Sequence, residues 1–274
     1  MNQLSGSRYP SLPQAWGIFG IFVAVSLGLG LLFATLLPSI GISNQSIINF
    51  IGYNLSMPLV IWIAWRLKPV PGPGERTLYF KRIPAFLYVI LLLLSLSINV
   101  ILDPVTTAIP MPEYIEKIFA MLTNRDIWTF LTVGITGPIL EEGLFRGIIL
   151  DGFLNRYKPG KAIFWSAMLF GLFHMNPWQF IPAFLIGLLL GYIYLKTRSL
   201  IPVIFIHIIN NSFSYLTVYI FGEDVQSYRD IFTESVPYLM FLAIALLIFV
   251  FCLARLIMTI KEESHFKLET QLKQ

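Results

Sequence analysis

Apolar stretches long enough to cross a lipid bilayer recur along this chain of 274 residues. A transmembrane helix needs about 20 predominantly apolar residues. Only 12% of the residues are charged, whereas a soluble domain has about 25%. We therefore expect an all-α polytopic membrane protein, a bundle of about eight transmembrane helices forming a single membrane domain over residues 1–274. The expected spans are residues 15–37, 46–65, 84–102, 127–154, 162–175, 180–195, 200–221 and 236–256.

Basic residues alternate between loops in the way that sets membrane topology. The segments before the first span and after the second, fourth, sixth and eighth spans are richer in Lys and Arg than the loops between them. Cytoplasmic loops carry such an excess, so we expect both termini in the cytoplasm and residues 257–274 as a charged cytoplasmic tail. Bases scattered over short loops offer no duplex-binding face, so the net charge of +4 does not indicate a nucleic-acid partner.

Local features predict irregularities within this bundle. The fifth and sixth spans are short, which predicts helices that do not reach both membrane faces, or a break around Asn176 and Pro177. Gly137-Pro138 predicts a kink in span four that frees a backbone carbonyl, and residues 114–122 predict a short interfacial helix. Two GxxxG pairs predict close helix packing: Gly143 with Gly147, and Gly187 with Gly191.

Span four carries Glu141, Glu142 and Arg146 at membrane depth, while Asp151 lies nearer its cytoplasmic end and is left outside the site. Ionisable groups at membrane depth are functional candidates because they cost free energy there. Glu142 and Arg146 stand four residues apart with the acid first, the favoured arrangement of a helical ion pair. Glu141 points about 100° away around the helix and is left as the unpaired acid. The plainer alternative is that both acids only compensate Arg146, but one acid would be enough for that.

Two further spans place polar groups at a similar depth. His174 lies in span five, and His207 and Asn211 share one face of span seven. A rise of about 1.5 Å per residue puts Glu141 and His174 about 20 Å from the basic ends of their spans. A carboxylate and an imidazole can activate water, while a second imidazole and a carboxamide can donate hydrogen bonds to an oxyanion. This set of groups suits the hydrolysis of a peptide bond.

Three motifs resemble those of a known family. They are Glu141-Glu142-x-x-x-Arg146, Phe170-x-x-x-His174 and His207-x-x-x-Asn211. In this order they are similar to the motifs of the CAAX-protease and bacteriocin-processing intramembrane peptidases, the group that contains the Ras-converting prenyl-protein endopeptidases. The likeness covers about residues 134–214 and includes the stretches LFRG, FGLFH and TRSLIPVIFIH.

The resemblance implies a role for each motif residue within a catalytic core over residues 127–221. Glu141 and His174 would activate water, His207 and Asn211 would form the oxyanion site, and Glu142 and Arg146 would support them. The family is glutamate-dependent or metallo. We favour a site that requires no cofactor, because Asn is a poor zinc ligand. The alternative is zinc held by Glu141, His174 and His207 from separate helices.

The expected function is an intramembrane endopeptidase that cleaves a membrane-associated peptide, either lipidated or carrying a leader. Its partners are membrane lipid and this substrate, and we expect it in the cell membrane of a prokaryote. The alternative is a non-catalytic membrane regulator or bacteriocin self-immunity protein of the same fold. A proton-coupled carrier is disfavoured, because the chain shows no internal repeat.

Overall fold

The computed structural model describes residues 9–68, 79–114, 124–222 and 227–272, with side chains described up to residue 259. Within these ranges the chain is helical and contains no strand. The all-α prediction is therefore confirmed. The expected interfacial helix over residues 114–122, and the side chains of the charged tail, lie outside what the structure describes.

Six of the described helices are long and apolar enough to cross a membrane, by length and composition. The fourth and fifth predicted spans are also helical: residues 127–154 form one rod of consecutive helical segments, and α8, Pro159–Phe173, is a shorter apolar helix. All eight predicted spans thus correspond to helices. The six are α1 (Leu12–Ser39), α2 (Gln45–Arg66), α3 (Ala85–Thr107), α9 (Pro177–Thr197), α10 (Leu200–Phe221) and α11 (Ser235–Leu272).

A break separates α8 from α9 where the sequence predicts one. Asn176 caps α9 by accepting a hydrogen bond from the Gln179 amide at 2.8 Å, and Met175 before it has a φ of 53°. With 15 residues, α8 is about 22 Å long, short of the roughly 30 Å hydrocarbon core. The prediction of a short helix therefore holds for α8. It is wrong for α9, which has 21 residues because the helix already begins at Pro177 and continues through Pro182.

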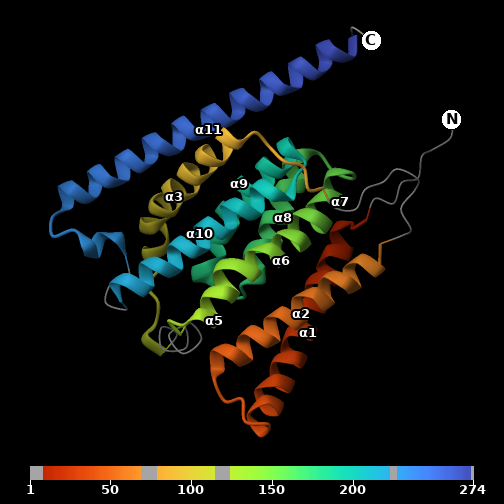
Figure 1. The fold of residues 1–274 in the computed structure, drawn as a ribbon, viewed down its shortest axis with the longest axis vertical. Coiled ribbons are helices and arrows are strands. Elements are labelled where there is room, and N and C mark those ends of the chain that lie inside the picture. Colours follow the sequence, from red (N-terminus) through yellow and green to blue (C-terminus); the bar gives the residue numbers. More distant parts are fainter. Residues whose placement is uncertain (1–8, 69–78, 115–123, 223–226, 273–274) are drawn as a thin grey trace.

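The helices pack as a bundle whose edges are helix pairs (Figure 1). Helix α11 lies beside α3 along one edge, α1 pairs with α2 along the other, and the rod of residues 127–154 lies between them with α8, α9 and α10. Large apolar side chains face outwards: Leu31 on α1 and Leu247 on α11 are each 70% exposed. The charged pair Glu142 and Arg146 is fully buried. An apolar exterior around a polar centre is what a lipid solvent favours.

Segments that are basic in sequence meet at one end of the bundle. The main chain of Tyr79 and Lys81 bonds to Ser199 and Leu200, with Ser199 Oγ donating to Lys81 O at 2.6 Å. The hydroxyl of Tyr157 accepts from the Leu12 amide at 3.0 Å. The segments before α3 and α10 therefore lie together, as do those before α1 and α8, and the Arg198–Asp151 pair at 3.4 Å joins the two sets.

Close packing explains one of the two GxxxG pairs. A Cβ at Gly187 would lie 3.1 Å from Ala167, and one at Gly191 would lie 3.0 Å from Ile163, so these glycines let α9 approach α8. The same interpretation is wrong for Gly143. A Cβ there would meet only Ile61 Cδ1, at 4.0 Å.

Candidate active site

Two π-helical turns flank the short helix that carries the acids. The rod consists of α5 (Ile127–Phe130), η1 (Leu131–Thr136), α6 (Gly137–Leu144), η2 (Phe145–Leu150) and α7 (Asp151–Leu154). At the first junction the Gly137 amide bonds to Thr132 O, five residues back, and a Cβ on Gly137 would lie 2.6 Å from that oxygen. Pro138 has no N–H to donate. The predicted irregularity at Gly137-Pro138 is therefore present as a π-helical turn, a feature often found at functional sites.

This turn frees two carbonyls that α10 then uses. In an α-helix, Val133 O and Gly134 O would accept from residues 137 and 138. Here Val133 O accepts from Nδ2 of Asn211 at 3.1 Å, and Gly134 O accepts from Oγ of Ser212 at 3.3 Å. The glycine–proline pair thus docks the rod onto the face of α10 that carries the third motif.

Glu142 and Arg146 form the predicted ion pair, and it is fully buried. Arg146 Nη1 donates to Glu142 Oε1 at 2.6 Å, and Nη2 donates to Gly187 O on α9 at 3.2 Å. The guanidinium carbon lies 4.6 Å from the centre of the Phe170 ring, a cation–π contact. Because removing either charge would leave the other unpaired in a dry interior, the two residues stabilise each other.

His207 lies between the two acids. Its Nδ1 is 2.8 Å from Glu142 Oε1, and its Nε2 is 3.7 Å from Glu141 Oε2. Glu142 is held by Arg146 and accepts the Nδ1 proton, so it fixes the orientation of the ring and directs Nε2 towards Glu141. Glu142 therefore supports both Arg146 and His207. Its contact with His207 joins residues 65 positions apart and has no signature in the sequence.

Glu141 has one oxygen held and one oxygen free. The Tyr53 hydroxyl on α2 donates to Oε1 at 2.6 Å. Oε2 is buried and has no hydrogen-bond partner among the described residues. The prediction that Glu141 is the unpaired acid holds only for Lys and Arg among the described residues, because His207 Nε2 lies 3.7 Å from Oε2. Tyr53 was missed by sequence reasoning. Its only sequence signal is a lone tyrosine within span two.

His174 reaches the same cluster from the end of α8. Its ring lies edge-on to Phe170 and Phe173, with centroids 5.5 and 5.9 Å apart. Its carbonyl accepts from the Asn176 side chain at 2.8 Å, which fixes the end of the helix. The Phe170 ring also contacts the His207 ring, with centroids 5.6 Å apart. Phe170 therefore contacts both imidazoles.

Asn211 lies one turn beyond His207 on α10, at the level of the first π turn. Its carboxamide nitrogen is anchored to Val133 O and its oxygen accepts from Asn210 at 3.3 Å. The structure therefore brings span four, α8 and α10 together as the depth estimate predicts. Asp151, which sequence reasoning leaves outside the site, pairs instead with Arg198 and Tyr194 near the basic end of the bundle.

The described residues do not present a ready metal site. No three His, Cys, Asp or Glu side chains among them converge closely enough to hold a metal ion. Nδ1 of His207 faces Glu142, and Glu141 Oε1 faces Tyr53. These two contacts leave Nε2 of His207 and Oε2 of Glu141 facing each other at 3.7 Å, so zinc held by Glu141, His174 and His207 stays a prediction.

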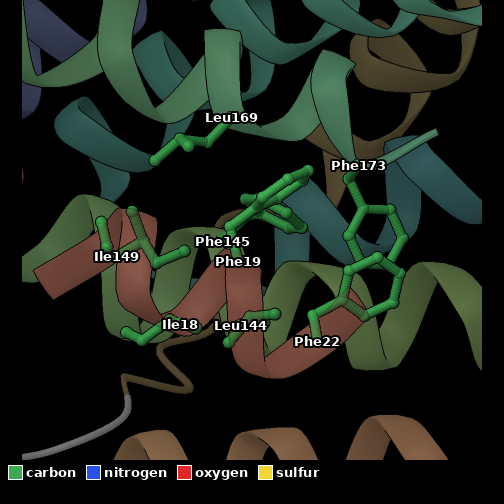
Figure 2. Close-up of a pocket in the computed structure, with 9 residues that line it drawn as sticks. Ile18, Phe19, Phe22, Leu144, Phe145, Ile149, Leu169 and Phe173 are labelled. Carbon is green, nitrogen blue, oxygen red and sulfur yellow. The ribbon is translucent and has the colours of Figure 1, made fainter. Parts of the chain in front are cut away.

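An apolar pocket lies where the rod of residues 127–154 packs against α1 and α8 (Figure 2). Phe173 stacks on Phe22 of α1 with ring centroids 4.0 Å apart, and the same Phe173 contacts the His174 ring. Phe173 therefore lies between the pocket and the His174 ring. Its lining is wholly apolar: Ala15, Ile18, Phe19, Phe22, Leu144, Phe145, Ile149, Leu169 and Phe173.

Comparison with known proteins singles out the same segment. Residues 123–213 match the family described as type II CAAX prenyl endopeptidase Rce1-like. The chain is 26% identical over 133 residues to the membrane-embedded CAAX protease MroQ of Staphylococcus aureus (strain USA300), which covers 46% of this chain and 53% of that protein. It is 32% identical over 108 residues to an uncharacterized 24.3 kDa protein of Escherichia coli, covering 36% of this chain and 49% of that one.

These likenesses cover only part of this chain and part of each relative. The chain spans about half the length of the curated relatives it matches. No solved structure matches it significantly. The family match contains every residue of the cluster described above except Tyr53, which comes from α2.

Proposed function

We propose that this chain, which belongs to the CAAX-protease and bacteriocin-processing family of membrane proteins, is an intramembrane endopeptidase that cleaves a peptide bond with water activated at Glu141. One observation carries the proposal. Glu141 presents a buried carboxylate oxygen without a hydrogen-bond partner among the described residues, 3.7 Å from an imidazole nitrogen. A buried carboxylate oxygen that accepts no hydrogen bond is costly unless it is used.

Glu141 is the general base in this proposal. Oε2 takes a proton from a water molecule as the water oxygen bonds to the carbonyl carbon of the substrate. The Tyr53 hydroxyl on Oε1 holds the carboxylate so that Oε2 faces the reacting water. His174, at the free end of α8, orients that water. The groups on the chain suffice for this step, so the proposal needs no metal.

His207 and Asn211 stabilise the oxyanion that forms on the carbonyl oxygen. A neutral His207 that gives its Nδ1 proton to Glu142 has only a lone pair at Nε2, so donation from Nε2 requires the imidazolium form. The proposal gives His207 this form at the oxyanion step, with the oxygens of Glu142 and Glu141 lying 2.8 and 3.7 Å from its two ring nitrogens. The Asn211 carboxamide supplies the second donor.

The same groups complete the reaction. The tetrahedral intermediate collapses with cleavage of the C–N bond, and the proton held on Glu141 passes to the departing amine. The products are a new carboxyl end and a new amino end, and Glu141 returns as a carboxylate. Water is the only co-reactant, so atoms and charge balance.

The substrate class follows from where the site lies. The site is inside a multi-pass membrane protein, beside a pocket lined wholly by apolar side chains. We propose a membrane-associated peptide that enters from the lipid, either lipidated or carrying an apolar leader. We propose that both termini are cytoplasmic, because the basic segments meet at one end of the bundle and cytoplasmic loops carry an excess of Lys and Arg. We propose the cell membrane as the location of the protein. The test uses a reporter enzyme that works only outside the cytoplasm, fused to either terminus. Activity of this reporter would contradict the topology.

The test is cleavage by the purified protein in lipid vesicles. Two internally quenched peptides serve as probes, one ending in a farnesylated CAAX sequence and one carrying an apolar leader. We expect the wild type to cleave one of them, and Glu141→Gln to lower the rate by about 10²–10⁴, the usual contribution of a general base. Equal cleavage by wild type and variant would overturn the proposal.

The competing regulator has its own signature. If the protein is a non-catalytic regulator, cells carrying the Glu141→Gln variant should behave like cells carrying the wild type, provided that the variant inserts and folds. The peptidase proposal predicts that cells carrying the variant behave like cells that lack the protein. Comparing the membrane peptides of the two strains then identifies the substrate.

A further inference from the structure

A chain of carboxamides runs from Asn211 to the neighbouring helix α3. Asn210 Nδ2 donates to Asn211 Oδ1 at 3.3 Å, and Asn99 Nδ2 donates to Asn210 Oδ1 at 3.4 Å. Asn210 is 7% exposed, and Asn99 is 111 residues away in the chain. Three amides in series at the edge of the cluster are unusual in a bilayer, where polar side chains are expensive.

The direction of these hydrogen bonds is fixed independently at both ends. The Ser214 hydroxyl gives its one proton to Asn210 O at 3.0 Å, so it can only accept from Asn99, whose Nδ2 lies 2.7 Å away. At the far end, Val133 O can only accept, which requires the nitrogen of Asn211 to face it. The two constraints agree. Reversing any one amide would place two acceptors or two donors together.

A clamp on α3 holds the outer end of this chain. The Tyr228 hydroxyl donates to Asn99 Oδ1 at 2.6 Å. One helical turn along α3, the carboxylate of Asp103 accepts from Ser227 Oγ, the Tyr228 amide and the Tyr238 hydroxyl at 2.8, 2.9 and 3.1 Å. Asp103 therefore fixes the main chain of Tyr228, and Tyr228 fixes the carboxamide of Asn99. Sequence reasoning places Asp103 in a loop, but α3 continues to Thr107 and buries it.

We propose that Asn99 and Asn210 are positioning residues for Asn211. They form a polarised amide relay, locked by Tyr228, that holds the Asn211 carboxamide with its nitrogen towards the oxyanion. One N–H of that nitrogen goes to Val133 O, and the second is left for the substrate. This inference rests on the proposed function, since it assigns the relay to the oxyanion step. Neither Asn99 nor Tyr228 touches the reacting atoms.

The first test reads the relay without any reaction. In the full-length protein labelled with ¹⁵N-asparagine, we expect Tyr228→Phe to shift the side-chain amide signals of Asn99, Asn210 and Asn211 together. Tyr238→Phe is the matched control, because it removes a hydroxyl from the same clamp and leaves the amide chain intact. It should leave the Asn210 and Asn211 signals unchanged. A shift confined to Asn99 in the Tyr228→Phe protein would overturn the relay.

The second test reads the consequence for cleavage of the peptide used above. We expect Asn99→Leu to lower kcat by about ten- to a hundredfold, the cost of a catalytic group displaced by a fraction of an ångström to 1 Å, with KM unchanged. Tyr238→Phe should keep the wild-type kcat. Wild-type kcat in Asn99→Leu, with Glu141→Gln inactive, would overturn the positioning role and leave the peptidase proposal standing. If the wild type cleaves neither peptide, the peptidase proposal fails, and the amide signals still decide whether the relay exists.

Discussion

The Tyr53 hydroxyl donates a hydrogen bond to Oε1 of Glu141 at 2.6 Å, and the two residues are 88 positions apart in the sequence. This bond leaves Oε2 as the only free oxygen of the carboxylate, and it ties α2 to the acidic helix. The orientation of Glu141 is therefore set by a residue from a helix outside the three motifs.

Tyr53→Phe removes this bond and keeps the ring. A hydrogen bond to a charged group contributes about 1.5–3 kcal/mol, so we expect kcat to fall by roughly 10- to 150-fold while the protein still inserts and folds. Steady-state cleavage of the quenched peptide measures this. Tyr215→Phe is the matched control, since its hydroxyl bonds to Asp126 O at 2.8 Å, away from Glu141. An equal loss in both variants would show that the Tyr53 hydroxyl has no special role.

Arg146→Met leaves Glu142 as a buried charge without its main partner. Breaking one side of a buried pair costs about 3–5 kcal/mol, and we expect a correspondingly lower thermal midpoint in detergent. The double variant Glu142→Gln with Arg146→Met should recover part of this stability but not activity, because His207 loses its anchor. Arg198→Met provides the comparison, since Arg198 is 44% exposed in its pair with Asp151. Equal destabilisation by Arg146→Met and Arg198→Met would contradict the buried-pair account.

Gly137→Ala tests the π turn before the acids. The added Cβ would lie 2.6 Å from Thr132 O, a backbone atom that cannot move aside cheaply. We expect a loss of about 1–3 kcal/mol together with lower activity, because Val133 O and Glu141 shift with the turn. Gly143→Ala on the same helix meets only Ile61, at 4.0 Å, and should change neither the thermal midpoint nor the cleavage rate. The account would fail if both substitutions were tolerated equally.

Removal of metal should leave the reaction unchanged. The proposed base, oxyanion donors and proton donor are all side chains of the chain, so a chelator such as 1,10-phenanthroline should not slow cleavage. Metal analysis of the purified protein is the accompanying measurement. Activity that a chelator removes and zinc restores would show that Glu141, His174 and His207 rearrange into a metal centre.

Much of the fold is predictable because lipid imposes simple rules on sequence. Span four and α10 begin and end at the predicted residues. Each begins directly after an N-cap residue, because Asp126 and Ser199 both accept hydrogen bonds from the first turn of their helices. The Glu142–Arg146 pair is predictable because its spacing is local. The predicted end of span three is five residues too early, because the sequence treats Asp103 as a loop residue although tertiary partners bury it inside α3.

The rest of the site depends on contacts that spacing cannot reveal. Tyr53 on Glu141, Glu142 on His207 and Asn99 on Asn210 each join residues at least 65 positions apart. No periodicity marks them, since each helix contributes one polar group to an otherwise apolar face. The π turn is signalled only in part. Gly137-Pro138 predicts an irregularity, but the docking of Asn211 on Val133 O appears only once α10 is in place.

The central claim is that Glu141 and His207 act on one reacting group, and a double-mutant cycle tests it most directly. Cleavage rates are measured for Glu141→Gln, His207→Gln and the double variant. Residues that act as a unit show strongly non-additive losses, so we predict a double variant about as slow as the slower single variant. Losses that multiply would mean that the two side chains act independently, and would contradict the shared site.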